Sequence, residues 1–109
     1  MNNPQGEATM YYMVKALTQD ETFIFISKDE QEVLSKRTEW MNELTGAFFL
    51  QPIHPTLTPA NKKYAIFGTS FHNGKYYYFI YHFDTNSVVY KGTNFERLIA
   101  KITQLTIND

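Results

Sequence analysis

One pair of side chains in this sequence has a spacing suited to acid–base chemistry. His82 and Asp84 are two residues apart in a predicted strand, so both project from one face, where a carboxylate can orient an imidazole. Thr85 and Ser87 lie beside them and could supply a hydroxyl nucleophile. No glycine-rich phosphate loop and no G-x-S-x-G motif accompanies them. We therefore expect a protein that is not an enzyme, with catalysis at His82 and Asp84 as a minor alternative.

Metal and cofactor chemistry has less support still. The chain has no cysteine, and its histidines are His54, His72 and His82. His72 and His82 are separated by the length of a strand, about 30 Å at ~3.3 Å per residue, so they cannot share an ion. No cluster of carboxylates completes a site. We expect neither a metal ion nor a cofactor.

A charged residue interrupts the apolar side of the first predicted helix. Arg37 falls inside an arc of about 120° that holds the apolar residues of this helix, which are Val33, Leu34, Trp40, Met41 and Leu44. Its stem can cover apolar surface while the guanidinium reaches water or a carboxylate. Alternatively, Arg37 and Trp40 form the rim of a pocket for an anion or a stacked ring. This small-ligand pocket is the third functional hypothesis.

Tyrosine and phenylalanine are unusually abundant. The 109 residues include nine Phe, eight Tyr and one Trp, and the tyrosines concentrate on and around the segment 75–83. A single tyrosine is most often core or rim, with its hydroxyl reaching water. Together, however, these are more rings than two short helices cover, so we expect several to be exposed as a binding surface. The expected partner-binding residues are Tyr76, Tyr77, Tyr78, Tyr81, Tyr90, Lys75, Lys91, Arg37 and Trp40.

Two kinds of macromolecule suit such a surface. Interface cores are rich in Tyr, Phe, Trp, Met and Arg, so the leading hypothesis is a small accessory or regulatory module that binds a protein, or a second copy of itself. Free edges at 47–53 or 88–91 could add a strand from that partner. The alternative is single-stranded RNA or DNA, with bases stacked on tyrosines and phosphates contacted by lysines, the candidates being Lys62, Lys63, Lys75 and Lys91.

Charge does not favour nucleic acid strongly. Residues 1–60 carry four Lys and Arg against eight Asp and Glu, whereas residues 61–109 carry six against three. The overall net charge is −1, which gives no long-range attraction to phosphate. No segment has the ~18 consecutive apolar residues of a membrane span, and the first residues do not resemble a signal peptide. We expect a cytoplasmic protein that does not bind membranes.

The elements that position these residues follow from hydrophobic patterning and turn signals. Strands are predicted over 10–18, 22–27, 47–53, 63–71, 75–83 and 88–91. Helices are predicted after the capping boxes Ser27–Glu30 and Thr93–Glu96, the first ending at Gly46. The order β-β-α-β-β-β-β-α indicates an α+β fold whose mainly antiparallel, strongly curved, even barrel-like sheet packs against two helices. Residues 1–9 are expected to be a mobile tail and 10–109 one domain.

The segment Asn73-Gly74 predicts a two-residue hairpin turn, because both central positions of a type I′ turn need positive φ. This turn places His72 opposite Lys75. Tyr76 and Tyr78 then share a face with Phe67 and Phe71, while the next strand adds Val88 and Tyr90 to the opposite face. Neither face is polar.

Overall fold

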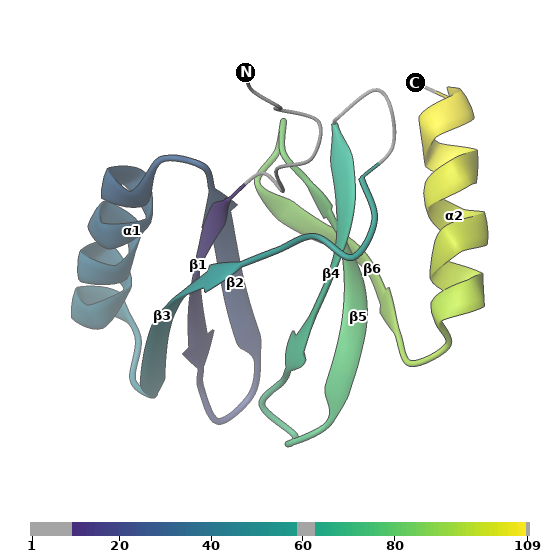
Figure 1. Cartoon of the computed structure of the whole chain (residues 1–109). Helices are drawn as coiled ribbons and strands as arrows, with labels where there is room; N and C mark the ends of the chain where they lie inside the picture. Colours follow the sequence, from purple (N-terminus) through teal and green to yellow (C-terminus); the bar gives the residue numbers. More distant parts are fainter. Residues whose placement is uncertain (1–9, 59–62, 109) are drawn as a thin grey trace.

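The computed structural model describes residues 10–58 and 63–108 (Figure 1). The elements run in the order β1 (Tyr11–Leu17), β2 (Thr22–Ser27), α1 (Glu30–Glu43), β3 (Ala47–Ile53), β4 (Tyr64–Ser70), β5 (Tyr76–His82), β6 (Ser87–Gly92) and α2 (Phe95–Asn108). The predicted α+β class and element order are confirmed. The tail predicted over residues 1–9 lies outside the described residues.

The strands form two open antiparallel sheets, and neither closes into a barrel. Sheet A has the order β2-β1-β3 and sheet B the order β4-β5-β6. They pack face to face, with α1 outside sheet A and α2 outside sheet B, so the molecule has four layers (Figure 1). We call the sheet faces that meet the inner faces and those beneath the helices the outer faces.

The main core lies between the two inner faces. Its largest fully buried side chains include Met13 and Ile26 from sheet A and Phe67, Phe79 and Tyr81 from sheet B. Strand residues alternate between the two faces of a sheet, so each sheet contributes every second residue to this core. Both faces of sheet B are apolar because both are covered, which is the arrangement that strands without polar alternation require.

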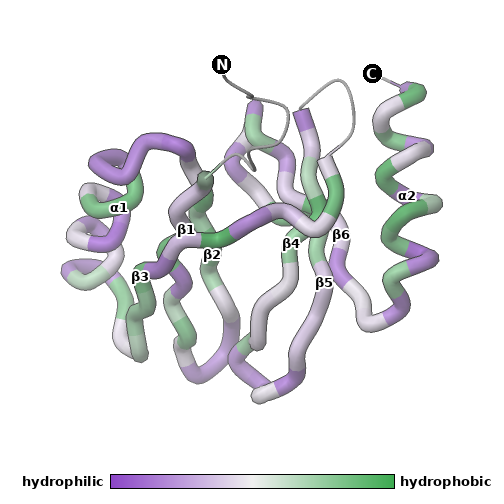
Figure 2. Tube along the Cα trace, in the orientation of Figure 1, coloured by the Kyte–Doolittle hydropathy of each residue, from purple (hydrophilic) through white to green (hydrophobic). Residues whose placement is uncertain are grey.

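The two helices differ in how much surface they bury. Leu98 and Ile102 of α2 are fully buried against Ile66 and Ile80 of sheet B. In α1 only Val33 is buried. Figure 2 shows the contrast: α1 is mostly hydrophilic, whereas hydrophobic residues recur along α2. The apolar arc predicted for the first helix is therefore only partly buried: Leu34, Trp40 and Leu44 are half-buried, and Met41 is 50% exposed.

Each helix begins at a cap that lies later in the chain than predicted. The Asp29 carboxylate accepts from the Gln31 N–H at 2.9 Å and caps α1. The Asn94 side chain accepts from the Glu96 N–H at 3.0 Å and caps α2. Asp and Asn serve this function as well as Ser and Thr do. Gly46 does not adopt a positive φ, and α1 ends before it.

The turn between β4 and β5 differs from the prediction and changes the faces of the hairpin. The Phe71 N–H donates to the Lys75 carbonyl at 2.8 Å, and the Gly74 N–H donates to the Phe71 carbonyl at 2.8 Å. The loop therefore has three residues, His72, Asn73 and Gly74, with Gly74 at φ +80°. A shift of one residue in the register moves every side chain of β5 to the other face relative to β4.

The observed register gives each face of sheet B its composition. Ser70 pairs with Tyr76 and Gly68 with Tyr78, so both of these tyrosines lie on the outer face. Tyr77, Phe79 and Tyr81 lie on the inner face, opposite Thr69, Phe67 and Ala65. The predicted placement of Tyr76 and Tyr78 beside Phe67 and Phe71 is wrong.

A bulge in β6 produces a second change. Ile80 pairs with Tyr90 and Tyr81 pairs with Val88, which leaves Val89 as an extra residue. Val88 therefore packs on the inner face, whereas Tyr90 packs against α2 on the outer face. The prediction that Val88 and Tyr90 share a face is wrong, because the sequence does not mark the bulge.

Candidate protein-binding site

The most exposed tyrosine of the central hairpin is Tyr76, on the outer face of sheet B. Its exposed fraction is 58%. The tip of its ring leans across Gly68: a Cβ placed on this glycine would lie 2.5 Å from the Tyr76 hydroxyl and 2.9 Å from its ring. Because Gly68 has no side chain, the ring can rest on the strand backbone. An exposed ring held in this way loses little conformational freedom on binding.

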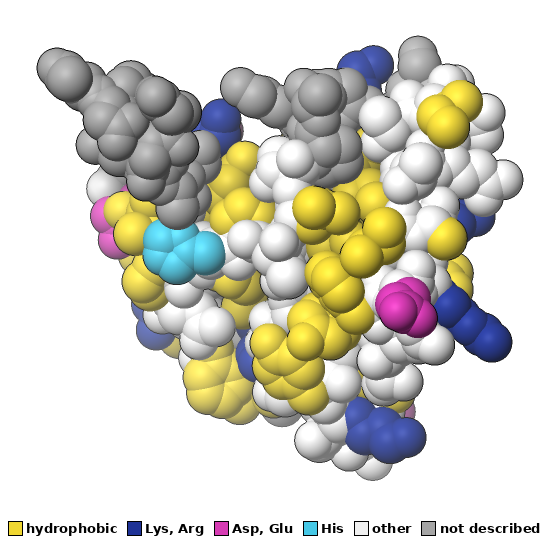
Figure 3. Space-filling view, turned by 45° about the vertical axis from the view of Figure 1, so that its right-hand side comes forward, with side chains coloured by type: hydrophobic (Ala, Val, Ile, Leu, Met, Phe, Trp, Pro, Cys, Tyr) yellow, Lys and Arg dark blue, Asp and Glu magenta, His cyan; other side chains and the backbone are white. Residues whose placement is uncertain are grey.

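Two further rings continue this surface toward α2. The Tyr76 and Tyr78 centroids are 5.8 Å apart in an edge-to-face arrangement, and those of Tyr78 and Phe95 are 5.0 Å apart. Tyr78 and Phe95 are half-buried against the core beneath α2. Lys75, at the turn, is exposed. We call Tyr76, Tyr78 and Phe95 the aromatic surface. Lys75 pairs with Phe71 and is therefore in phase with the inner face. Hydrophobic side chains are also prominent on the side of the molecule shown in Figure 3.

The other three predicted tyrosines are buried or half-buried. Tyr81 is completely buried, and Tyr77 packs against the inter-sheet core with its hydroxyl accepting from the Asn73 side chain at 3.0 Å. Tyr90 is half-buried beneath α2. Of the five predicted binding tyrosines, Tyr76, Tyr78 and Tyr90 lie on the outer face, and the rings of Tyr76 and Tyr78 contact each other there.

Tyr81 connects the two sheets by a buried hydrogen bond. Its hydroxyl accepts from the Ile26 N–H at 3.1 Å, and Ile26 belongs to β2, at the edge of sheet A. Burial raises the pKa of Tyr81 to about 12, partly offset by this bond to the backbone. The phenol therefore satisfies a donor of the edge strand from inside the core.

Arg37 and Trp40 lie on α1, which packs outside sheet A, so the two sheets separate them from the aromatic surface. Trp40 packs against Phe23 of β2, with the ring centroids 6.0 Å apart. Both side chains are half-buried, and Arg37 makes no ion pair within the described residues. This arrangement favours the structural interpretation of Arg37, in which its stem covers apolar surface.

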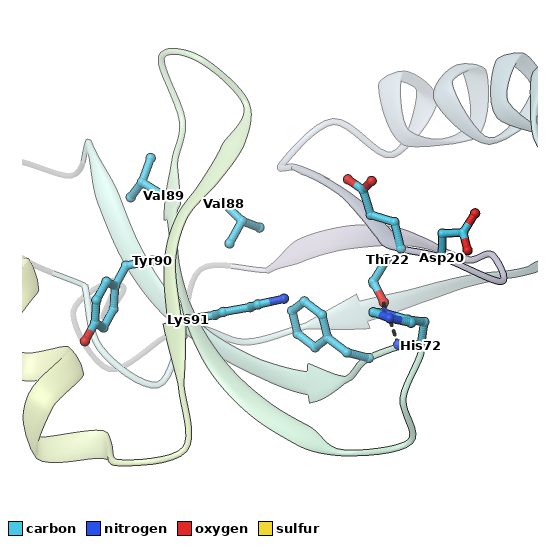
Figure 4. Close-up of a pocket in the computed structure, with 9 residues that line it drawn as sticks. Asp20, Thr22, His72, Val88, Val89, Tyr90 and Lys91 are labelled. Atoms are coloured by element: carbon cyan, nitrogen blue, oxygen red, sulfur yellow. Dashed lines mark hydrogen bonds between the residues drawn. The ribbon is translucent and has the colours of Figure 1, made fainter.

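Lys91 also faces away from the aromatic surface, into a groove between the β2 and β6 edges (Figure 4). Its Nζ lies 4.7 Å from the ring centroid of Phe71. Asp20 and Glu21 line the groove too, which has a volume of about 450 Å³. None of these three charged groups forms an ion pair within residues 10–58 and 63–108. The groove could hold a charged side chain or a small polar ligand.

Sequence reasoning missed one buried cation. Lys15 is only 6% exposed, on the inner face of β1. Its Nζ donates to Thr69 Oγ1 at 2.9 Å and to the Ser70 carbonyl and Oγ, each at 3.2 Å, and it lies 5.3 Å from the Phe49 ring centroid. Desolvation lowers the pKa of Lys15. The one available signal was its position in an apolar strand, in phase with Tyr11 and Met13.

The residues considered as a minor catalytic alternative lie close together in the turn between β5 and β6. His82 Nδ1 lies 3.0 Å from Thr85 Oγ1, and Thr85 Oγ1 lies 2.7 Å from Ser87 Oγ. The Asp84 carboxylate is 3.8 Å from His82 Nε2 and is 64% exposed, which is too long for an orienting hydrogen bond. The hydroxyl contacts join the two ends of the turn, and they give no support to a hydrolytic site.

The described residues contain no group of three or more side chains placed to hold a metal ion, and no helix among them is long and apolar enough to cross a membrane. Lys62 lies outside these residues. Comparison of the chain with protein-family models, with curated proteins and with solved structures gave no match.

Proposed function

We propose that this protein is a small, non-enzymatic binding module of the cytoplasm that engages a protein partner through the aromatic surface. The observation that carries the proposal is Tyr76, a ring that is 58% exposed and yet rests on the backbone of Gly68. Binding sites obtain much of their free energy from a few aromatic anchors that are ordered before the partner arrives.

A protein partner is favoured over single-stranded nucleic acid by where the lysines lie. Stacked bases need cations that follow the phosphates along the same face. Lys91 lines the groove between the sheets and contacts Phe71, whereas Tyr76 and Tyr78 lie on the outer face. Lys75 pairs with Phe71 and is in phase with the inner face as well, so neither of these two lysines shares the face of Tyr76 and Tyr78.

Site-directed photo-crosslinking tests this function. A benzophenone amino acid replaces Tyr76 in one variant and Met41 in a control variant, because Met41 is comparably exposed at 50% but lies on α1. We expect a discrete protein adduct at position 76 and none at position 41 in lysate of cells that make the protein. Excess wild-type chain should suppress the adduct at least about tenfold more strongly than excess Tyr76→Ala, as expected for loss of an anchor of more than about 1.4 kcal/mol.

Three outcomes would refute the proposal. The first is the absence of an adduct at position 76, and the second is the same adducts at positions 76 and 41. The third is an adduct that nuclease removes, which would support the nucleic-acid alternative. Tyr76→Phe should compete as wild type does if the ring is the anchor.

A further inference from the structure

The four edges of the two sheets differ in how well they are protected from pairing with another strand. An edge strand presents unpaired N–H and C=O groups and invites another strand unless it is covered, bulged, charged or short. The β4 edge is covered, because the Ile66 N–H donates to the Leu57 carbonyl at 2.8 Å and the Thr56 N–H donates to the Ile66 carbonyl at 2.7 Å. Farther along β4, Lys15 Nζ donates to the Ser70 carbonyl.

The edges on the other side of the molecule are also protected. On β2, the Ile26 N–H donates to the Tyr81 hydroxyl. On β6, the bulge at Val89 interrupts the regular spacing that a new strand would need. The groove of Figure 4 separates these two edges.

The β3 edge lacks such protection. No described residue pairs with its free side, and its seven residues, AFFLQPI, contain no charge. Phe49, on the inner face, is 44% exposed. Pro52 limits pairing near one end, as edge prolines do, but the segment before it remains open.

The hydrogen-bonding pattern of the β1–β2 hairpin determines which backbone N–H and C=O groups of β3 are left on its free edge. The Thr18 N–H donates to the Glu21 carbonyl at 3.0 Å, so the even-numbered residues of β1 bond to β2 and the odd-numbered ones to β3. On β3, the partners of those odd-numbered residues are Ala47, Phe49, Gln51 and Ile53. The free edge therefore carries the N–H and C=O of Phe48 and Leu50. Pro52, which has no N–H, falls in the same phase.

We propose that β3 pairs antiparallel with β3 of a second copy of this chain, with Phe49 on the two-fold axis. In this register Phe48 and Leu50 of one copy exchange hydrogen bonds with Leu50 and Phe48 of the other. Two sheets A become one six-stranded sheet, and Phe49 meets its own symmetry mate. A two-fold contact brings the residue on the axis against its own copy and pairs the flanking residues reciprocally. A strand without charge and with apolar side chains on both faces is therefore complementary to itself.

The absence of cysteine makes a direct test possible. Phe49 and its symmetry mate would form a non-hydrogen-bonded pair with Cα atoms about 4.5 Å apart, within the range that a disulfide spans. Phe49→Cys should oxidise to a covalent dimer, whereas Val89→Cys should not. Val89 is the matched control because it is 42% exposed on another edge strand. Equal oxidation of both variants would mean random collision and would overturn the proposal.

Sedimentation of charge variants provides the second measurement. The wild-type chain of 12.8 kDa should sediment as a dimer, and Phe49→Glu and Phe49→Lys, each checked for folding by circular dichroism, should each raise the dissociation constant at least about tenfold because like charges meet on the axis. Mixing the two variants should restore a dimer. A wild-type monomer at millimolar concentration, or a dimer indifferent to these charges, would overturn the proposal. Either result leaves the Tyr76 experiment unaffected, because Tyr76 lies on the outer face of sheet B.

Discussion

Removing the hydroxyl of Tyr81 should destabilise the protein at neutral pH and change how its stability depends on alkali. In Tyr81→Phe the buried Ile26 N–H loses the acceptor that lies 3.1 Å away. An unsatisfied buried donor costs about 1–3 kcal/mol. At about 4–8 °C per kcal/mol for a domain of this size, the variant should melt at least several degrees below wild type. Urea unfolding followed by circular dichroism measures the free energy difference directly.

The pH dependence follows from the raised pKa. Burial raises the pKa of Tyr81 from 10.0 to about 12 in the folded protein. Below pH 10 the phenol is protonated in both states, so its contribution to stability is complete. Between pH 10 and 12 the unfolded chain loses this proton more readily, and folding loses up to about 3 kcal/mol at 1.36 kcal/mol per pKa unit. The wild-type advantage should therefore shrink above pH 10 and be mostly or entirely lost by pH 12.

The difference in stability between wild type and Tyr81→Phe reports on the Tyr81 phenol alone. Burial also raises the pKa of Tyr11, but Tyr11 is present in both proteins and its effect cancels in the difference. Tyr76→Phe is the control, because it removes an exposed phenol and should change stability at pH 7 by no more than about 0.5 kcal/mol. A Tyr81→Phe variant as stable as wild type at pH 7, or a difference that stays constant to pH 12, would refute the reasoning.

Substitutions at three other positions test the backbone and the buried cation. Gly74→Ala should cost about 1–2 kcal/mol in urea unfolding because Gly74 has a φ of +80°, and Gly74→Asn should recover part of the loss; equal stability of all three proteins would contradict the turn. Gly46→Ala should cost at least about 2 kcal/mol, since a Cβ there collides with the Leu17 carbonyl, and a smaller loss would mean that β1 moves aside easily. Desolvation lowers the pKa of Lys15, so stability should rise with pH between that lowered pKa and the ordinary value near 10.5. Lys15→Met should abolish this rise, and a rise that persists in the variant would assign it to another group.

The sequence predicts elements well because each has a local cause. The strands follow β-branched and aromatic runs, and the helices follow capping residues. The register of the β4–β5 hairpin could not be predicted from the sequence, because Asn73-Gly74 fits both a two-residue and a three-residue loop. The two loops differ in whether His72 or Phe71 pairs with Lys75. That single residue decides which face carries Tyr76.

The candidate site was predicted in part. Counting rings against the area of two helices predicted that several tyrosines are exposed, but of the five predicted ones only Tyr76 is exposed, at 58%. The same count could not foresee that the strands divide into two sheets, whose inner faces meet and enclose Tyr81. Nor could it place Lys15, because its acceptors, Thr69 and Ser70, lie more than fifty residues away. Long-range pairings of this kind leave no local signal.

Among the strands that the structure describes, the chain passes from sheet A to sheet B only once. Everything from β1 to β3, with α1, belongs to the first pair of layers, and everything from β4 to β6, with α2, belongs to the second. The protein is thus two consecutive half-molecules whose largest shared surface is the inter-sheet core. A chain cleaved between Leu57 and Tyr64 should therefore yield two fragments, each with one apolar sheet face uncovered, that recover their fold only when they recombine.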